Sequence, residues 1–211
     1  MSWIDVSVGI RDGMVHWPDN PPVHVEKTMD MAHGDAANVS KISFGVHTGT
    51  HMDAPIHFKP GAASIDEVAL EAGVGPARVI AIRDPVKIAV AELEPYGIEA
   101  GERLLFKTAN SPRAWQASAF AENAVYISVE AARWLAARKV RTVGIDYLSV
   151  GGFAAENGVQ VHEPMLDAGI TIIEGLDLTD APAGPCDLIC LPIKIIGCDG
   201  APARAFVRPR D

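Results

Sequence analysis

Metal-ligating side chains are concentrated in one short segment, His47-Thr-Gly-Thr-His51-Met-Asp53-Ala-Pro-Ile-His57. The segment holds three of the seven histidines of the chain together with one carboxylate. Neutral imidazole and carboxylate together suit zinc, manganese or iron. A lone histidine is most often structural, but three with an aspartate at this spacing favour a ligand set. The segment therefore predicts a divalent cation held by His47, His51 and Asp53.

The spacing of the first two histidines constrains the backbone between them. In a straight strand His47 and His51 would lie ~13 Å apart, too far to share a metal. On a helix they would share a face, but Thr-Gly-Thr is a poor helical turn. We therefore expect the chain to bend at Gly49, which has the conformational freedom for it. Beyond the bend, His51 and Asp53 are expected to project together from an extended stretch.

A second carboxylate, Glu174, lies in the apolar run Ile170-Thr-Ile-Ile-Glu174-Gly-Leu, which indicates a buried strand. A buried carboxylate is costly unless it is paired with a cation, a metal or a proton. A core glutamate satisfied by hydrogen bonds fits this position about as well as a metal ligand does. His162 stands twelve residues earlier. Together with the first segment, His162 and Glu174 predict a five-ligand site able to hold one or two metals.

Strands dominate the elements that must position these residues. The predicted strands are rich in β-branched residues and bounded by Gly, Pro, Asp or Asn: Trp3–Val8, Val39–Val46, Arg78–Ile82, Leu104–Lys107, Val125–Ile127, Thr142–Ile145, Ile170–Glu174 and Leu188–Ile193. Alternation of Ile42, Phe44 and Val46 with polar residues predicts an apolar face toward a core, with His47 on the opposite face.

Helical patterns are fewer. The strongest is Ser128–Arg138, with Ser128 as N-cap, and others cover Val90–Tyr96, Ser64–Ala72 with a Ser64/Glu67 capping box, and Pro164–Ala168. Strand, helix and strand from Val125 to Ile145 predict a βαβ crossover. We expect an α/β protein in which a mixed sheet is surrounded by peripheral helices, as one domain over residues 1–211.

Composition excludes several classes of protein. The formal net charge of −9 argues against nucleic acid and against an anionic membrane surface. The chain starts without a signal-peptide pattern, and no apolar run has the length of a membrane span. Cys186 and Cys190 lie in an apolar stretch and are expected to be buried free thiols. These features predict a cytoplasmic protein.

The histidine-rich segment resembles the H-x-G-T-H-x-D-x-P-x-H signature of the cyclase family of metal hydrolases, to which bacterial kynurenine formamidases and isatin hydrolases belong. The resemblance spans nearly the whole chain. It also includes Trp17-Pro18, Gly144-Ile-Asp146, His162, Glu174-Gly-Leu and Asp199-Gly-Ala-Pro-Ala-Arg204.

This resemblance implies a swivelling β/β/α fold, a homodimer or larger homo-oligomer, and hydrolysis of a small aromatic amide or lactam. It also implies that His47, His51, Asp53, His162 and Glu174 hold one or two Zn²⁺ ions, with Asp53 and Glu174 placed to bridge them. Mn²⁺, as in isatin hydrolases, is the alternative metal. Two further roles follow from the resemblance: His57 as proton donor and acceptor, and Trp17 as an aromatic contact for the substrate.

The segments that would face the substrate depart from the formamidase pattern. The chain reads Trp17-Pro18-Asp19-Asn20 where formamidases have Trp-Pro-Gly-Asp, and Asp146-Tyr147-Leu148-Ser149 where they tend to have Asp-Thr-Pro-Ser. The expected substrate is an aryl formamide such as N-formylkynurenine, or a related lactam.

Other functions are compatible with parts of the pattern. An isatin hydrolase-like or lactone-cleaving relative, and a non-catalytic metal- or ligand-binding module, are the alternatives. No G-x-S-x-G elbow, G-x-G-x-x-G or P-loop motif is present, which argues against serine nucleophiles and nucleotide cofactors. Asp146 is expected either to orient a metal ligand or to cap a turn, and Trp17 either to stack on the substrate or to cover a dimer seam.

Overall fold

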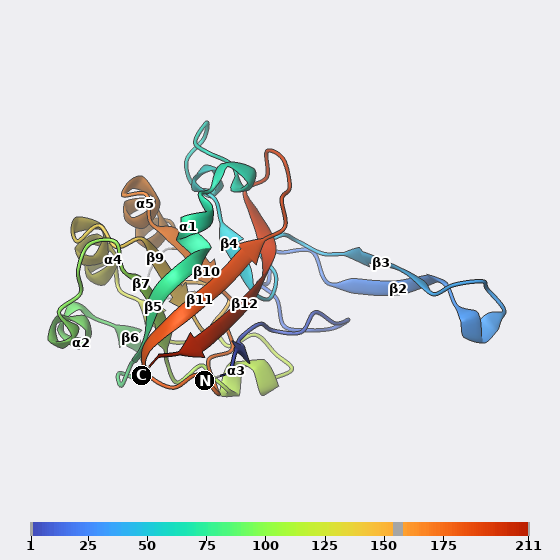
Figure 1. The fold of residues 1–211 in the computed structure, drawn as a ribbon, viewed down its shortest axis with the longest axis horizontal. Helices are drawn as coiled ribbons and strands as arrows, with labels where there is room; N and C mark the ends of the chain where they lie inside the picture. The colour runs from blue at the N-terminus through green and yellow to red at the C-terminus, as the bar shows by residue number, and fades with distance from the viewer. Residues whose placement is uncertain (1, 154–157, 211) are drawn as a thin grey trace.

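The computed structural model describes residues 2–153 and 158–210, and its centre is a mixed sheet that closes on itself (Figure 1). The strand order is β1, β12, β11, β5, β7, β9, β10, β4, and β4 also pairs with β12. The strands of this sheet are β1 (Ile4–Asp5), β4 (His51–Asp53), β5 (Val74–Ala81), β7 (Arg103–Lys107), β9 (Thr142–Ile145), β10 (Thr171–Glu174), β11 (Gly184–Pro192) and β12 (Gly200–Pro209). The pairing of β4 with both β10 and β12 closes the barrel.

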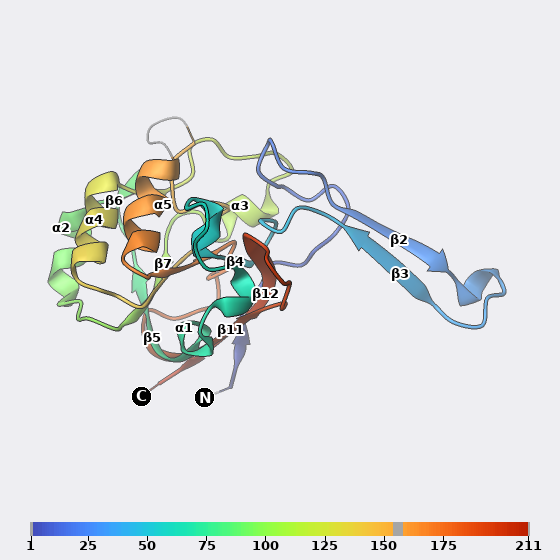
Figure 2. The same ribbon diagram turned by 90° about the horizontal axis from the view of Figure 1, so that it is seen from above.

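Strand direction divides the barrel into two parts. Strands β5, β7, β9 and β10 are parallel to one another. All pairings that involve β1, β4, β11 or β12 are antiparallel. The helices are α1 (Leu70–Gly73), α2 (Val90–Leu93), α3 (Arg113–Gln116), α4 (Val129–Ala137) and α5 (Gly158–Asp167). Figure 2 shows α2, α4 and α5 side by side along the parallel part of the sheet. Mixed sheet and peripheral helices confirm the predicted fold class.

Alternation along the central strands builds two separate cores. Leu104 and Phe106 of β7 belong to the cluster shared with the helices, whereas Leu105 belongs to the cluster around the antiparallel strands. Cys186 and Cys190 are buried in this second cluster as free thiols, as predicted. Burial raises the pKa of Cys190 to about 12, which keeps its thiol protonated and unreactive.

Strand prediction failed mainly at the antiparallel edge and at short strands. Strand β12 was missed because its residues include Pro202 and Pro209, which argue against a strand in the middle of a sheet. Strands β2 (His24–Met29) and β6 (Lys87–Ile88) were also missed. The predicted βαβ crossover is wrong in its pairing, because β8 (Tyr126–Ile127) pairs with β6 rather than with β9. Strand β9 instead pairs in parallel with β7, so that α4 lies in the connection from β7 to β9, and α5 lies in the connection from β9 to its other parallel neighbour, β10.

The strand predicted over residues 39–46 lies outside the core. Strands β2 and β3 (Val39–Ser43) form a two-stranded ribbon that extends away from the barrel (Figures 1 and 2). Every residue of both strands is exposed, and Ile42 is 54% exposed. The predicted burial of the Ile42 face was therefore wrong: alternation identified a strand with an apolar face, but not the surface against which that face packs.

The predicted N-caps are present, but two of the predicted helices are each divided into an α-helix and a 3-10 turn. Ser128 caps α4, and its side chain accepts from the Ala131 amide. The Glu67 carboxylate accepts from the Ser64 amide at 3.0 Å, as a capping box requires. The helix predicted over 64–72 nevertheless divides into a 3-10 turn (Ile65–Glu67) and α1, and that over 90–96 into α2 and a 3-10 turn (Glu94–Tyr96). Two further 3-10 turns cover Met31–His33 and Pro55–His57.

Helix α5 begins at Gly158, six residues before the start predicted at Pro164. A glycine and an internal proline both disfavour a helix, which hid its first half from sequence patterns. In the parts of the chain that are described, no helix combines the length and apolar composition needed to cross a bilayer.

Gly175 provides a test of how tightly the fold packs next to Glu174. Gly169 and Gly175 both have positive φ, +76° and +70°, but a β carbon at Gly169 would enter open space, whereas one at Gly175 would overlap the Gly49 carbonyl. Gly169→Ala should cost ~1–2 kcal/mol of unfolding free energy for its left-handed backbone. Gly175→Ala should cost at least ~3 kcal/mol because overpacking adds to that strain. Urea unfolding of both variants followed by circular dichroism measures the difference, and equal losses would contradict this packing.

Candidate metal centre

The five predicted metal ligands converge from four parts of the chain. His47 lies in the loop before β4, His51 and Asp53 lie on β4, His162 lies on α5, and Glu174 ends β10. Their ligand atoms form two groups within which all atoms lie within 4.8 Å of one another: His47, His51 and Asp53, and Asp53, His162 and Glu174. Asp53 belongs to both groups, so the arrangement suits two cations that share one carboxylate.

The register of β4 between its neighbours places two of these residues directly. On one side Glu174 stands opposite His51, and on the other side Gly200 stands opposite Asp53. Opposite residues of antiparallel strands have neighbouring side chains, and His51 Nε2 lies 3.2 Å from Glu174 Oε2. Alternation puts Asp53 on the same face as His51, with their ligand atoms 3.5 Å apart. The predicted extended geometry of this pair is confirmed.

The bend predicted at Gly49 is present, with φ of +61°. It turns the chain so that the rings of His47 and His51 lie 5.1 Å apart, and His47 Nδ1 lies 2.9 Å from Asp53 Oδ1. A β carbon at Gly49 would lie 2.8 Å from Ile10 Cδ1, so both the backbone conformation and the packing require glycine.

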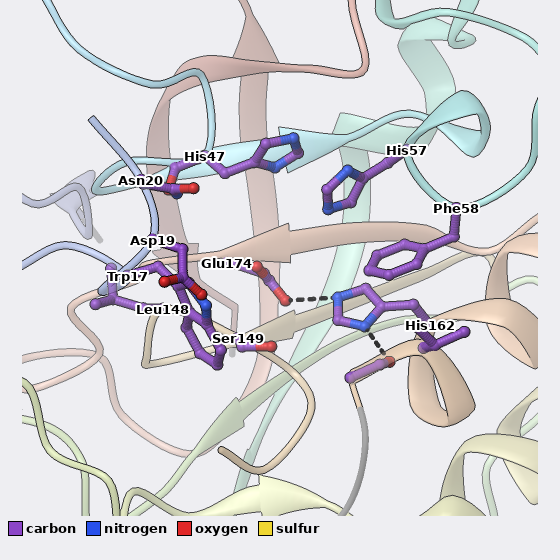
Figure 3. Close-up of a pocket in the computed structure, with 12 residues that line it drawn as sticks. Trp17, Asp19, Asn20, His47, His57, Phe58, Leu148, Ser149, His162 and Glu174 are labelled. Carbon is purple, nitrogen blue, oxygen red and sulfur yellow. Dashed lines mark hydrogen bonds and ion pairs between the residues drawn. The ribbon is translucent and has the colours of Figure 1, made fainter. Parts of the chain in front are cut away.

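Helix α5 brings His162 to the second group. Its Nε2 lies 3.2 Å from Glu174 Oε1 and 3.6 Å from Asp53 Oδ2. Figure 3 shows the contact between His162 and Glu174. The other ring nitrogen of His162, Nδ1, donates to the Gly158 carbonyl at 2.6 Å. His51 is held in the same way, with Nδ1 donating to the Gly49 carbonyl at 2.9 Å. Both histidines therefore turn Nε2 toward the carboxylates.

Two atoms at the centre of the site are without a hydrogen-bond partner. His51 Nε2 and Asp53 Oδ2 are buried and unsatisfied among the described residues. Buried polar atoms normally have a partner. An imidazole nitrogen and a carboxylate oxygen that lack partners within groups of potential ligands suit a cation, so these residues fit a metal ion.

Electrostatics in the metal-free protein point the same way. Burial would lower the pKa of His51, but the neighbouring carboxylates of Asp53 and Glu174 raise it to about 10. Burial also opposes the raised pKa of His162, which its bond to Glu174 produces. The pKa values of Asp53 and Glu174 are lowered by the neighbouring histidines despite burial. Positive charge therefore stabilises the two carboxylates, and protons occupy the position that suits a cation.

His57 lies beside the two groups rather than within them. The 3-10 turn Pro55–His57 presents its ring, which stacks on that of His47 with centroids 3.9 Å apart. Burial lowers the pKa of His57, so the imidazole is neutral near pH 7. A neutral, partly exposed imidazole beside a candidate metal site is suited to proton transfer.

The site lies at the base of a pocket of about 370 Å³ (Figure 3). Its lining combines the ligand residues with apolar and polar side chains from loops: Trp17, Asp19, Asn20, His47, His57, Phe58, Leu148, Ser149, Gly158, Val159, His162 and Glu174. Trp17 is held edge-on against Phe120 and Phe153, with centroids 5.2 and 5.5 Å away. A flat substrate reaching the ligand residues would contact this ring.

Two aspartates near the site, Asp146 and Asp199, accept hydrogen bonds from other parts of the chain. Asp146 is buried and accepts from the Thr108 amide and hydroxyl and from the Ser111 amide, which is the turn-capping role. Asp199 Oδ2 lies 2.8 Å from His47 Nε2. Asp199 belongs to the residues that resemble the cyclase family, but no role was predicted for it. The 152 residues that separate it from His47 left no local pattern by which to find it.

Known proteins are similar along nearly the whole chain. The family model named Cyclase matches residues 4–151. A kynurenine formamidase of Bacillus cytotoxicus is 31% identical over 207 residues, covering 98% of this chain and 97% of that protein. A solved structure described as a potential metal-dependent hydrolase with cyclase activity has a TM-score of 0.86 at 33% identity, covering 100% of this chain and 98% of that chain. Isatin hydrolase A from Ralstonia solanacearum has a TM-score of 0.82 at 26% identity, covering 98% of this chain and 91% of that chain.

Proposed function

Because this chain belongs to the cyclase family, we propose that it is a metal-dependent hydrolase that cleaves the carbon–nitrogen bond of a small aromatic formamide or lactam. The observation that carries the proposal is the pair of ligand groups sharing Asp53 at the base of a pocket with an aromatic wall. The kynurenine formamidase and isatin hydrolase relatives support the substrate class.

The ligand assignment is part of the same proposal. His47, His51, Asp53, His162 and Glu174 would hold one or two Zn²⁺ ions, with Mn²⁺ as the alternative. Two carboxylates and three histidines suit either metal. The buried, unsatisfied His51 Nε2 and Asp53 Oδ2 support a cation at this position.

The residues around the site divide the chemistry between them. When bound, the cation polarises a substrate carbonyl and activates water for attack at neutral pH. His57 takes the proton of the attacking water and returns it to the leaving nitrogen, for which its lowered pKa leaves it neutral and ready to accept. Trp17 holds the aromatic part of the substrate, and the rings of Phe120 and Phe153 fix its orientation.

Two alternatives depend on different observations. Isatin and lactone ring opening would use the same carbonyl chemistry, and the isatin hydrolase similarity favours the former as second candidate. A non-catalytic binding module would have no use for a neutral histidine stacked on His47. Hydrolysis of a formanilide separates an enzyme from a binding module, and comparison with isatin separates the two enzymes.

We also propose that the protein is a cytoplasmic homodimer. The free thiols of Cys186 and Cys190 support a reducing compartment.

The β2–β3 ribbon supports self-association, because it exposes Val25, Met29 and Ile42 without burying any residue of its own strands. Two-stranded ribbons are marginally stable when isolated, so contact with a second subunit would stabilise this one.

Metal removal tests the proposed function. Dialysis of the purified protein against a chelator should abolish hydrolysis of a formanilide, and added Zn²⁺ or Mn²⁺ should restore it, with one to two equivalents bound by elemental analysis. Asp53→Ala should regain neither metal nor activity, because Asp53 belongs to both ligand groups. Full activity after complete removal of transition metals would refute the proposal.

His57→Ala tests the proton-transfer role. The variant should keep its metal and lose turnover by ~10²–10⁴-fold, the usual contribution of a general acid–base group. His33→Ala is the matched control, because His33 is exposed in the turn that ends the β2–β3 ribbon. Loss of metal by His57→Ala would make His57 a ligand instead.

Trp17→Ala tests the aromatic contact. The variant should raise KM for an aryl formamide more than for a small aliphatic one, because only the aryl substrate loses a ring contact worth ~0.5–1.5 kcal/mol beyond burial. Steady-state kinetics on both substrates, with the dimer–monomer equilibrium measured in parallel, gives the answer. Unchanged KM values with a weakened dimer would place Trp17 at the subunit seam.

A further inference from the structure

Asp199 binds a ring nitrogen of His47, a proposed ligand, although it precedes β12 at the far end of the chain. Its Oδ2 lies 2.8 Å from His47 Nε2 and 3.7 Å from His57 Nδ1. Only the first distance is a hydrogen bond. Asp199 therefore acts on His47 rather than on His57.

The two nitrogens of His47 face different carboxylates. Nδ1 lies 2.9 Å from Asp53 Oδ1, inside the first ligand group, whereas Nε2 faces Asp199 at the edge of the site. A neutral imidazole that binds a cation through one nitrogen carries its proton on the other. The Asp199 carboxylate accepts that proton's hydrogen bond and so selects the tautomer whose Nδ1 is free for the cation.

The residue after Asp199 restrains the same ring. A β carbon at Gly200 would lie 2.7 Å from His47 Cε1 and 2.9 Å from the Met52 carbonyl. The ring of His47 therefore packs against the backbone of Gly200, which stands opposite Asp53 in the sheet. Asp199 holds the ring of His47 by a hydrogen bond, and Gly200 leaves room for the ring because it has no side chain.

His47 differs from the other two histidines in what holds it. Backbone carbonyls of Gly49 and Gly158 fix His51 and His162, and no substitution removes a carbonyl. His47 depends on a side chain, and that side chain is 48% exposed. A carboxylate partner also raises the basicity of a ligating histidine more than a carbonyl does.

We propose that Asp199 is a positioning residue that holds His47 with Nδ1 toward the cation and so sets the affinity of the first ligand group for metal. This inference rests on the proposed metal site. The rival assignment makes Asp199 a ligand, because His47, His57 and Asp199 also form a group with ligand atoms within 4.8 Å.

Zinc affinity separates these assignments. Metal-free wild type, Asp199→Ala and Asp199→Asn would be titrated with Zn²⁺ in competition with a chromophoric chelator. Asp199→Ala should weaken the affected site by ~10–100-fold, the usual effect of losing such a partner, at unchanged stoichiometry. Asp199→Asn should restore most of the affinity, because its amide oxygen still accepts from Nε2–H. Asp187→Ala is the matched control, since Asp187 pairs with Arg208 on β12, away from the site.

A spectroscopic readout reports the tautomer itself. Two-bond ¹H–¹⁵N correlation spectra of the zinc-loaded wild type should show His47 protonated at Nε2, and Asp199→Ala should broaden or shift that signal. Unchanged zinc affinity in Asp199→Ala would overturn the proposal, and loss of one equivalent with the remaining affinity intact would make Asp199 a ligand. Wild type that binds no zinc would overturn the metal site as well, which distinguishes failure of the proposed function from failure of this inference.

Discussion

The carboxylates of Asp53 and Glu174 share one buried site, and their mutual repulsion has to be offset by positive charge. Burial and the charge of Asp53 push the pKa of Glu174 upward, and the neighbouring imidazoles of His162 and His51 bring it down. Three imidazoles provide this compensation in the metal-free protein, and the pKa of each is raised above its ordinary value by the carboxylates it faces. A divalent cation held by these residues would supply the positive charge in place of protons on the histidines, and Asp53 Oδ2, which lacks a partner, would be free to hold it. Folding of the site and binding of metal would then be coupled through the same charge balance.

Barrel closure is the structural condition for that balance. Strand β4 is three residues long, yet it pairs with β10 on one side and β12 on the other. This double pairing places Glu174 opposite His51, and it places Gly200 where the ring of His47 needs space. A shift of one residue in either register would turn His51 and Asp53 to the opposite face. Antiparallel pairing on both sides of a short strand thus fixes two of the proposed ligands.

Local sequence patterns predicted the proposed metal ligands more completely than they predicted the strands and their packing. His47, His51 and Asp53 could be predicted because they are close in sequence and because a bend at Gly49 is the one way to bring the first two together. Glu174 was predicted as a carboxylate in an apolar run, and His162, twelve residues earlier, was added to it only in combination with the first segment. Asp199 could not be found in this way, because its partner is determined by closure of the sheet between β12 and β4. The exposure of Ile42 could not be predicted either, because alternation does not say whether an apolar face meets the same chain or another surface.

The pocket lining and the proposed metal ligands come from different structural elements. The ligands come mainly from strands and from α5, whereas Trp17, Asp19 and Leu148 line the pocket from loops. The departures from the formamidase pattern fall in these loops, so substrate preference can change while the ligands keep their register. The pocket loops and the proposed ligands are in contact at Asn20. Asn20 donates to the His47 carbonyl at 3.2 Å, so the loop that carries Trp17 is tied to the backbone of a proposed ligand. We therefore expect changes in this loop to reach the candidate metal site through His47. Among the three proposed histidine ligands, His47 is held by the side chain of Asp199, whereas His51 and His162 are held by backbone carbonyls.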